Sequence, residues 1–194
     1  CYKRTWYRKP NKGRNNKQHN KSNQYFTKTI IMARKVFTSF HYVPDNWRAS
    51  QIRNMGKIEG NSIATTNSWE EVTRGGDRAI EKWIDHNMCG KSCVIVFVGE
   101  NTAGRKWINY EIKKAWNEGR GIFGIHIHNL KDSNGNQANK GNNPFDGFSV
   151  NDKSLSSIVK CYNPPYTTST YVYDHIKENL EDWIEEAIKI RKNY

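Results

Sequence analysis

The sequence predicts an α/β fold in three layers, with a mainly parallel central sheet between two layers of helices. Residues 93–98 are apolar throughout and 122–127 are nearly so, as strands covered on both faces are. Amphipathic helical patterns alternate with these runs, including one over 104–118 that lies between them. Strands that alternate with helices imply parallel pairing, and a length of 194 residues fits one domain.

The first predicted unit is a short strand followed by a helix. Residues 36–40 form a β-rich run, and Asp45 follows at the position of a helix cap. The stretch 56–68 is rich in Gly, Asn, Ser and Thr, and Ile63-Ala64 is predicted as a short second strand within it. The helix would turn inward a row made of Trp47, Ala49, Ile52 and Met55.

The middle of the chain holds two predicted helices and two predicted strands. Asp77 is expected to cap a helix that ends before the strand at 93–98. A second helix, over about 104–118, leads into the strand at 122–127. The inward residues would be Ala79, Ile80, Trp83 and Ile84 in the first helix, and Trp107, Ile108, Ile112, Ala115 and Trp116 in the second.

The last third of the chain is predicted to contain a long loop, a short strand and a helix. Residues 129–150 are rich in Asn and Gly, and loops of that length are usually functional or disordered. Residues 155–162 are predicted as the last strand. The C-terminal helix carries an apolar stripe made of Ile176, Leu180, Trp183, Ile184, Ala187 and Ile188.

The positive charge is concentrated at one end. The chain has 31 Lys and Arg against 19 Asp and Glu, but nine of the basic residues and none of the acidic ones lie in 1–31. We expect this segment to be a disordered basic arm. It is either an electrostatic tether for nucleic acid or an anionic membrane, or upstream sequence before a natural start near Met32. We favour the second interpretation, so nucleic acid and membrane partners are not expected, and 32–194 is expected to be a single domain.

The sequence also indicates a compartment. The longest wholly apolar run, 93–98, is far shorter than the roughly 20 residues of a membrane span, and no early segment reads as a signal peptide. Four cysteines are too few for a disulfide framework in a chain of this length. We therefore expect a cytoplasmic location.

Two motif matches are rejected on their context. Residues 119–124 match the spacing G-x-G-x-x-G, but they close a helix and open a strand, whereas a dinucleotide fingerprint follows a strand and opens a helix. His126 and His128 share one strand face, and a metal pair is conceivable. No carboxylate or cysteine stands at a supporting spacing, so no metal is expected.

Glu111 is the most informative polar residue. It lies in the helical row with Trp107 and Ala115 and borders the apolar stripe, so its carboxyl group is expected to be partly desolvated. The alternative is a surface carboxylate that pairs with Lys114. In open α/β sheets ligands bind beyond the carboxyl ends of the strands, where the loop at 40–42 also lies. Aromatic side chains there could stack on a base or a nicotinamide ring, or could belong to the core.

Several separated segments resemble one family. Residues 36–42 resemble the first strand of Toll/interleukin-receptor (TIR) domains, and 105–112 resemble the W-x-x-x-E segment of NAD-cleaving TIR domains. Residues 124–127 and 140–146 resemble more specifically the bacterial TIR-like proteins of the Thoeris anti-phage system, the ThsB family. The resemblance spans about 34–188.

The resemblance implies a flavodoxin-like TIR fold and a function. Family members cleave NAD at the nicotinamide–ribose bond and make a cyclic ADP-ribose-type signal during phage infection, which a separate effector, ThsA, reads. NAD would be the substrate, and no cofactor is expected. Glu111 would be the catalytic carboxylate, and Trp69 occupies the place of a mobile loop after the second strand. The other residues implied to form the pocket are Ser39, Phe40, His41, Tyr42 and Trp107.

The chemistry of the bond fits one carboxylate. Nicotinamide leaves as a neutral molecule, so no general acid is required, and the need is for an anion that stabilises an oxocarbenium ion. The alternative function is a non-catalytic TIR-like adaptor that acts through protein contacts. Because TIR domains assemble with one another, a homo-oligomer is expected in either case, and a phage-derived trigger for the enzyme is conceivable.

Overall fold

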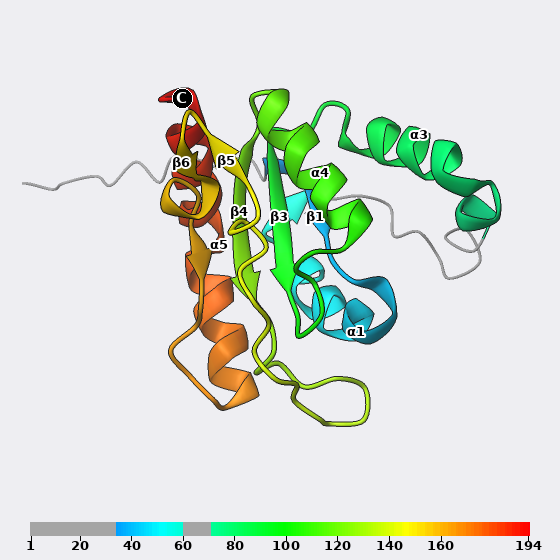
Figure 1. The fold of residues 1–194 in the computed structure, drawn as a ribbon. Coiled ribbons are helices and arrows are strands. Elements are labelled where there is room, and N and C mark those ends of the chain that lie inside the picture. Colours follow the sequence, from blue (N-terminus) through cyan, green and yellow to red (C-terminus); the bar gives the residue numbers. More distant parts are fainter. Residues whose placement is uncertain (1–33, 60–70) are drawn as a thin grey trace, which may run out of the picture. The chain divides into compact units, whose positions relative to one another are not determined.

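Helices lie on both faces of a parallel sheet in the computed structural model, which describes residues 34–59 and 71–194 (Figure 1). The strand order is β2-β1-β3-β4-β7, and all four pairings are parallel. This is the order of flavodoxin-like folds, so the predicted three-layer α/β fold is confirmed. The strands are β1 Arg34–Ser39, β2 Ile58–Glu59, β3 Cys93–Val98, β4 Gly121–His126 and β7 Cys161–Tyr162.

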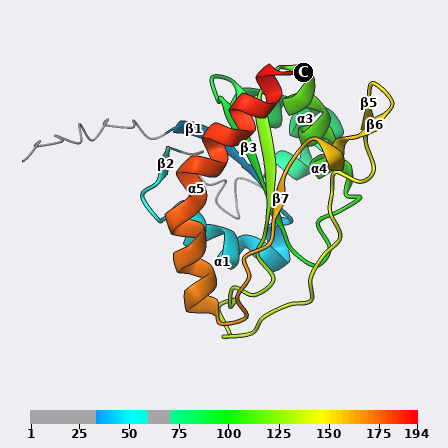
Figure 2. The same cartoon turned by 90° about the vertical axis from the view of Figure 1, so that its left-hand side faces the viewer.

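In the described residues, four long helices form the two outer layers. Helices α1 (Tyr42–Arg53) and α5 (Ser169–Lys192) cover one face of the sheet. Helices α3 (Gly76–Met88) and α4 (Lys106–Asn117) cover the other face, as Figure 2 shows from the side. The apolar patterns that predicted these helices are therefore confirmed.

Strand β3 lies at the centre and feeds both cores. All six of its residues are buried, and successive side chains point to opposite faces. Cys93, Ile95 and Phe97 join the core under α1 and α5, whereas Val94, Val96 and Val98 join the core under α3 and α4. This double burial explains why the strand is hydrophobic without alternation.

Two predicted helix caps are wrong. Helix α1 begins at Tyr42 with His41 as its N-cap, and Asp45 is buried within its first turn because its carboxyl group faces Arg48. Helix α3 begins at Gly76 with Gly75 as its N-cap, and the Asp77 carboxylate pairs with a lysine of α4 instead. The Trp47 side chain, predicted to face inward, is 55% exposed, because Ala49 and Ile52 already fill the buried side of α1.

The short elements differ most from the predictions. The second strand lies at Ile58–Glu59, and the predicted strand at Ile63-Ala64 falls outside the described residues. Of the predicted strand at 155–162 only the last two residues form a strand, β7, and its start forms a 3-10 turn, η1 (Leu155–Ser157). A small hairpin, β5 (Ser149–Val150) with β6 (Lys153–Ser154), was not predicted.

Other predictions concern location and the N-terminal segment. In the part of the chain that the structure describes, no helix is both long and apolar enough to cross a membrane. The three cysteines of this part, Cys89, Cys93 and Cys161, are free. The interpretation of 1–31 lies outside the described residues and stays a prediction.

Candidate active site

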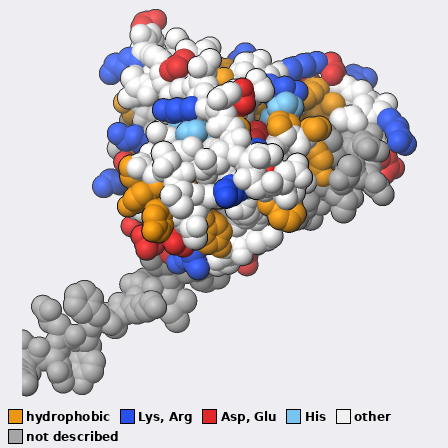
Figure 3. Space-filling model, turned by 90° about the horizontal axis from the view of Figure 1, so that it is seen from below, with side chains coloured by type: hydrophobic (Ala, Val, Ile, Leu, Met, Phe, Trp, Pro, Cys, Tyr) orange, Lys and Arg blue, Asp and Glu red, His pale blue; other side chains and the backbone are white. Residues whose placement is uncertain are grey.

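A pocket of about 400 Å³ opens at the carboxyl edge of the sheet, between the end of β1 and the start of α4. Figure 3 looks onto this edge, where a histidine lies beside hydrophobic side chains, with Lys and Arg side chains close by. The pocket is therefore formed by two segments that the sheet brings together from distant parts of the sequence. Its lining residues are Phe40, His41, Tyr42, Val43, Arg105, Lys106, Trp107, Ile108 and Glu111.

Glu111 forms the acidic part of the pocket. Glu111 is only 7% exposed, although a glutamate side chain in free solution is ionised at neutral pH. The Ser39 hydroxyl at the end of β1 donates a hydrogen bond of 2.5 Å to Glu111 Oε2. Ser39 does not line the pocket itself and contacts it through this carboxyl group. The bond joins residues 72 positions apart, so strand β1 and helix α4 together fix the orientation of the acid.

Burial changes the protonation of this acid. Desolvation raises the pKa of Glu111 to about 8, while the hydrogen bond from Ser39 acts in the opposite direction. This raised pKa favours the protonated carboxyl group at neutral pH. A cation placed beside it would favour its ionised form. The alternative pairing with Lys114 is wrong, because the Lys114 ammonium lies 3.0 Å from Asp85 and 2.6 Å from Glu118.

Aromatic rings form the walls of the pocket. The rings of Phe40 and Tyr42 lie with centroids 6.2 Å apart and stack, and Phe40 lies equally far from Phe97 in the core. Trp107 and Tyr110 meet edge to face with centroids 6.0 Å apart. The sequence left open whether these aromatic residues face a ligand site or belong to the core. They border the cavity and also pack against the core.

His41 lies beside these rings with an unusual environment. Its Nδ1 atom is buried and has no hydrogen-bond partner among the residues described. Burial, and then the positive charge of Arg105, lower the pKa of His41. The imidazole is therefore neutral at physiological pH.

Four lining residues were not predicted: Val43, Arg105, Lys106 and Ile108. Ile108 had been assigned to the core only. Arg105 is the N-cap of α4 and Lys106 its first residue, so both lie at the same end of the helix as the pocket. The signal that could have identified Arg105 and Lys106 is their place after β3, at the carboxyl edge of a parallel sheet.

Trp69 and the pair formed by His126 and His128 were also considered from the sequence. Trp69 falls outside the described residues, and its place near the pocket stays a prediction. The His126 and His128 rings meet edge to face with centroids 5.9 Å apart, away from the lining of the pocket. Within 34–59 and 71–194, no group of three His, Cys, Asp or Glu side chains could hold a metal ion. Burial and Lys140 lower the pKa of His126 to about 4, so this ring is neutral.

Fold and pocket together define a class of protein. A flavodoxin-like sheet with a W-x-x-x-E helix, whose glutamate lies buried in a pocket beside the first strand, is a TIR-like domain. Residues 37–132 match the family model described as "Thoeris protein ThsB, TIR-like domain". The matched segment is thus similar to the TIR-like domain of the ThsB family, which confirms the resemblance found in the sequence.

One relative is similar over more than half of the chain. It is the protein named "Putative cyclic ADP-D-ribose synthase ThsB1" from Bacillus cereus (strain MSX-D12), which is 37% identical over 120 residues. The aligned part covers 59% of this chain and 62% of that protein, so the similarity spans less than two thirds of its length.

Proposed function

We propose that this pocket cleaves NAD at the nicotinamide–ribose bond and produces a cyclic ADP-ribose-type signal in anti-phage defence. The observation that carries the proposal is the buried carboxyl group of Glu111, held by Ser39 at the bottom of an aromatic-walled cavity. The printed name of the relative, a cyclic ADP-D-ribose synthase, supports the same reaction.

The proposed reaction begins with ionisation of Glu111. The nicotinamide ring of NAD carries a positive charge, and its entry next to a buried carboxyl group lowers the pKa of that group. As the bond from the ring nitrogen to the ribose C1 atom breaks, the nitrogen keeps the electron pair and nicotinamide leaves neutral. Positive charge then develops on the ribose, where the Glu111 carboxylate stabilises it. A hydroxyl group or ring nitrogen of the same molecule forms the new bond to the ribose C1 atom, its proton passes to the Glu111 carboxylate or to water, and the cyclic product is closed.

The proposal includes partners. The product would be read by a separate effector of the ThsA type, in the cytoplasm, where NAD is available and thiols stay reduced. A homo-oligomer is proposed because Val43 and Trp47 are 84% and 55% exposed and stand one helical turn apart on α1. No cofactor is proposed, and NAD is a substrate only.

The decisive experiment measures nicotinamide and nucleotide products from NAD by mass spectrometry, with and without lysate of phage-infected cells. We expect Glu111→Ala and Glu111→Gln to reduce nicotinamide release at least about 100-fold, the size of effect seen when a group that stabilises transition-state charge is removed. Both variants should keep the circular dichroism spectrum of the wild type.

Unchanged turnover in the Glu111 variants would refute the proposed role of this residue. Absence of NAD loss in every condition, including infected lysate, would instead favour the adaptor function. In that case protection against phage should survive the Glu111 change.

A further inference from the structure

The pocket has an acidic residue at one end and basic residues at the other. Glu111 is buried at its inner end, whereas Arg105 and Lys106 are exposed at its opening. NAD has a matching arrangement, because its nicotinamide ring is a cation and its diphosphate carries two negative charges. A molecule of this kind can enter in only one direction without placing like charges together.

The two cations at the opening are not equivalent. The Lys106 ammonium pairs with Asp77 of α3 and lies 4.7 Å from the centre of the Trp107 ring, so its charge is already compensated. The guanidinium group of Arg105 makes no hydrogen bond or ion pair to any residue of the described part of the chain, and its backbone carbonyl accepts only the helical bond from the Asn109 amide. Its guanidinium group still lies close enough to His41 to lower the pKa of that ring. Arg105 is thus a cation with unused donors next to the cavity.

The start of helix α4 adds to the positive potential at this place. Arg105 is the N-cap of a 12-residue helix, and its side chain makes no capping hydrogen bond. The first backbone N–H groups of a helix point out of its N-terminus and carry a partial positive charge. An arginine fork beside such amides is suited to phosphate oxygens, which it can bind through two parallel hydrogen bonds.

We propose that Arg105 binds the diphosphate of the dinucleotide and thereby orients NAD so that the nicotinamide end faces Glu111. This inference rests on the proposed function and makes Arg105 a positioning and specificity residue. It predicts that the protein prefers NAD over a substrate that has the same nicotinamide–ribose bond but no diphosphate. Nicotinamide riboside is such a substrate.

The test compares wild type and Arg105→Ala with NAD and with nicotinamide riboside as substrates. We expect the KM for NAD to rise about tenfold with kcat within about twofold, since the lost contact is made in the ground state and the transition state alike. The KM for nicotinamide riboside should stay within about twofold of the wild-type value. The KM for NAD should also depend less on ionic strength in the variant.

Two further variants serve as controls. Arg105→Lys should recover part of the affinity for NAD, because the charge remains while the fork is lost. Lys153→Ala removes an exposed positive charge from β6, outside the pocket, and should leave both KM values unchanged. An equal loss for both substrates in Arg105→Ala, or no loss for NAD, would overturn the inference.

A binding measurement separates this inference from the proposed reaction. Calorimetry of the wild type with ADP-ribose and with adenosine needs no turnover. We expect Arg105→Ala to weaken ADP-ribose binding about tenfold and to leave adenosine binding unchanged. If nicotinamide is never released but this difference appears, the proposed reaction fails and the role of Arg105 stands. If nicotinamide is released but Arg105→Ala binds ADP-ribose like wild type, only the role of Arg105 fails.

Discussion

At the scale of single residues, the site depends on how Glu111 is protonated. The same burial that separates this carboxyl group from water also makes its ionised form unfavourable. The Ser39 hydroxyl compensates only part of that cost, through one hydrogen bond. The protonated carboxyl group is therefore favoured at the inner end of the pocket, and a cation beside it would favour the anion.

This balance makes a prediction about stability. The pKa of Glu111 is about 8 in the folded protein and near 4.5 in the unfolded chain, so the folded state retains a proton that the unfolded state releases. The protonated Glu111 side chain therefore contributes most to the stability of the folded state below about pH 4.5, and this contribution is lost progressively as the pH rises to about 8. Glu111→Gln cannot ionise, so relative to wild type its free energy of unfolding should improve by about 3 kcal/mol between pH 5 and pH 8.

Urea denaturation at a series of pH values measures this difference. Glu178→Gln, an exposed carboxyl group on α5, is the control and should follow the wild-type curve. Parallel pH curves for wild type and Glu111→Gln would show that Glu111 does not keep its proton in the folded protein.

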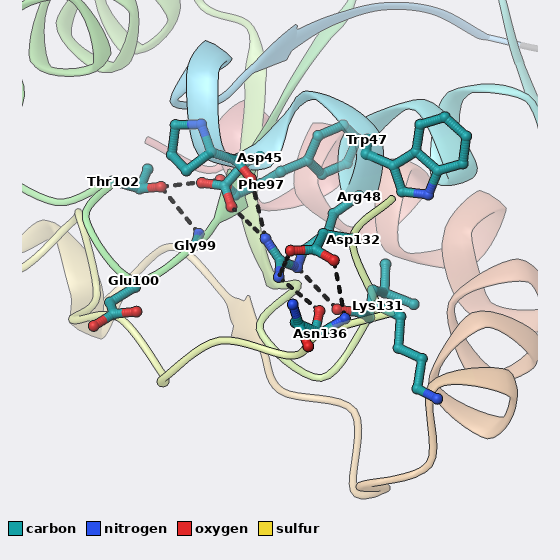
Figure 4. A network of polar contacts seen from close by, with 12 residues as sticks. Asp45, Trp47, Arg48, Phe97, Gly99, Glu100, Thr102, Lys131, Asp132 and Asn136 are labelled. Atoms are coloured by element: carbon teal, nitrogen blue, oxygen red, sulfur yellow. Dashed lines mark hydrogen bonds and ion pairs between the residues drawn. The ribbon is translucent and has the colours of Figure 1, made fainter. Parts of the chain in front are cut away.

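At the scale of elements, Arg48 of α1 anchors the loop that follows β4. Its residue is 4% exposed, and its guanidinium group donates to the carbonyl oxygens of Pro44, Leu130 and Asn136 (Figure 4). It also lies 3.5 Å from the Asp45 carboxylate and 3.7 Å from that of Asp132. The long loop was expected to be functional or disordered, and Arg48 is one reason that it adopts a defined path.

Removal of this anchor should loosen the loop. Arg48→Met leaves buried carbonyl groups and the Asp45 carboxyl group without their donor, which is expected to cost about 3 kcal/mol of stability. Hydrogen exchange should accelerate at the amide of Ala138, which bonds to the carbonyl of His128. Arg34→Met is the control, because its pair with Glu185 is exposed and should cost less than about 1 kcal/mol. Equal costs for the two variants would contradict the anchoring role.

The elements also show how far the sequence predicts this protein. Strands 93–98 and 121–126 were found to within a residue, because burial on both faces requires continuous apolar runs. Strands β2 and β7 are two residues long and exist because a neighbouring strand offers hydrogen bonds, which no local pattern reveals. Glu111 and the first loop could be predicted to meet, because both lie at the carboxyl edge of a parallel sheet. The bonds of Arg48 to distant carbonyl groups could not be predicted, because they depend on the path of a loop that no local pattern reveals.

At the scale of the whole molecule, the packing of α5 on the sheet depends on a small residue. A methyl group at Gly121 would lie 2.7 Å from the backbone nitrogen of Ile188 and 2.9 Å from the carbonyl carbon of Ala187. These are backbone atoms of a long helix and cannot move individually. Gly121 therefore sets how closely the C-terminal helix approaches β4.

Gly121→Ala should consequently destabilise the protein by about 2 kcal/mol, because the helix must shift to admit the methyl group. Gly147→Ala is the matched control, since a methyl group there meets no atom within 4 Å, and its stability should change by less than about 1 kcal/mol. Chemical denaturation of both variants measures the comparison. Similar midpoints for the two would show that α5 accommodates the extra carbon.

The hydrogen bond between Ser39 and Glu111 has a consequence for the protein during its synthesis. Its two ends are separated by 72 positions, and strand β3 must lie beside β1 before they can meet. A nascent chain leaving the ribosome therefore holds no assembled pocket until most of the sheet exists. Under the proposed reaction, an incompletely synthesised chain would therefore not consume the NAD of the cell that is producing it.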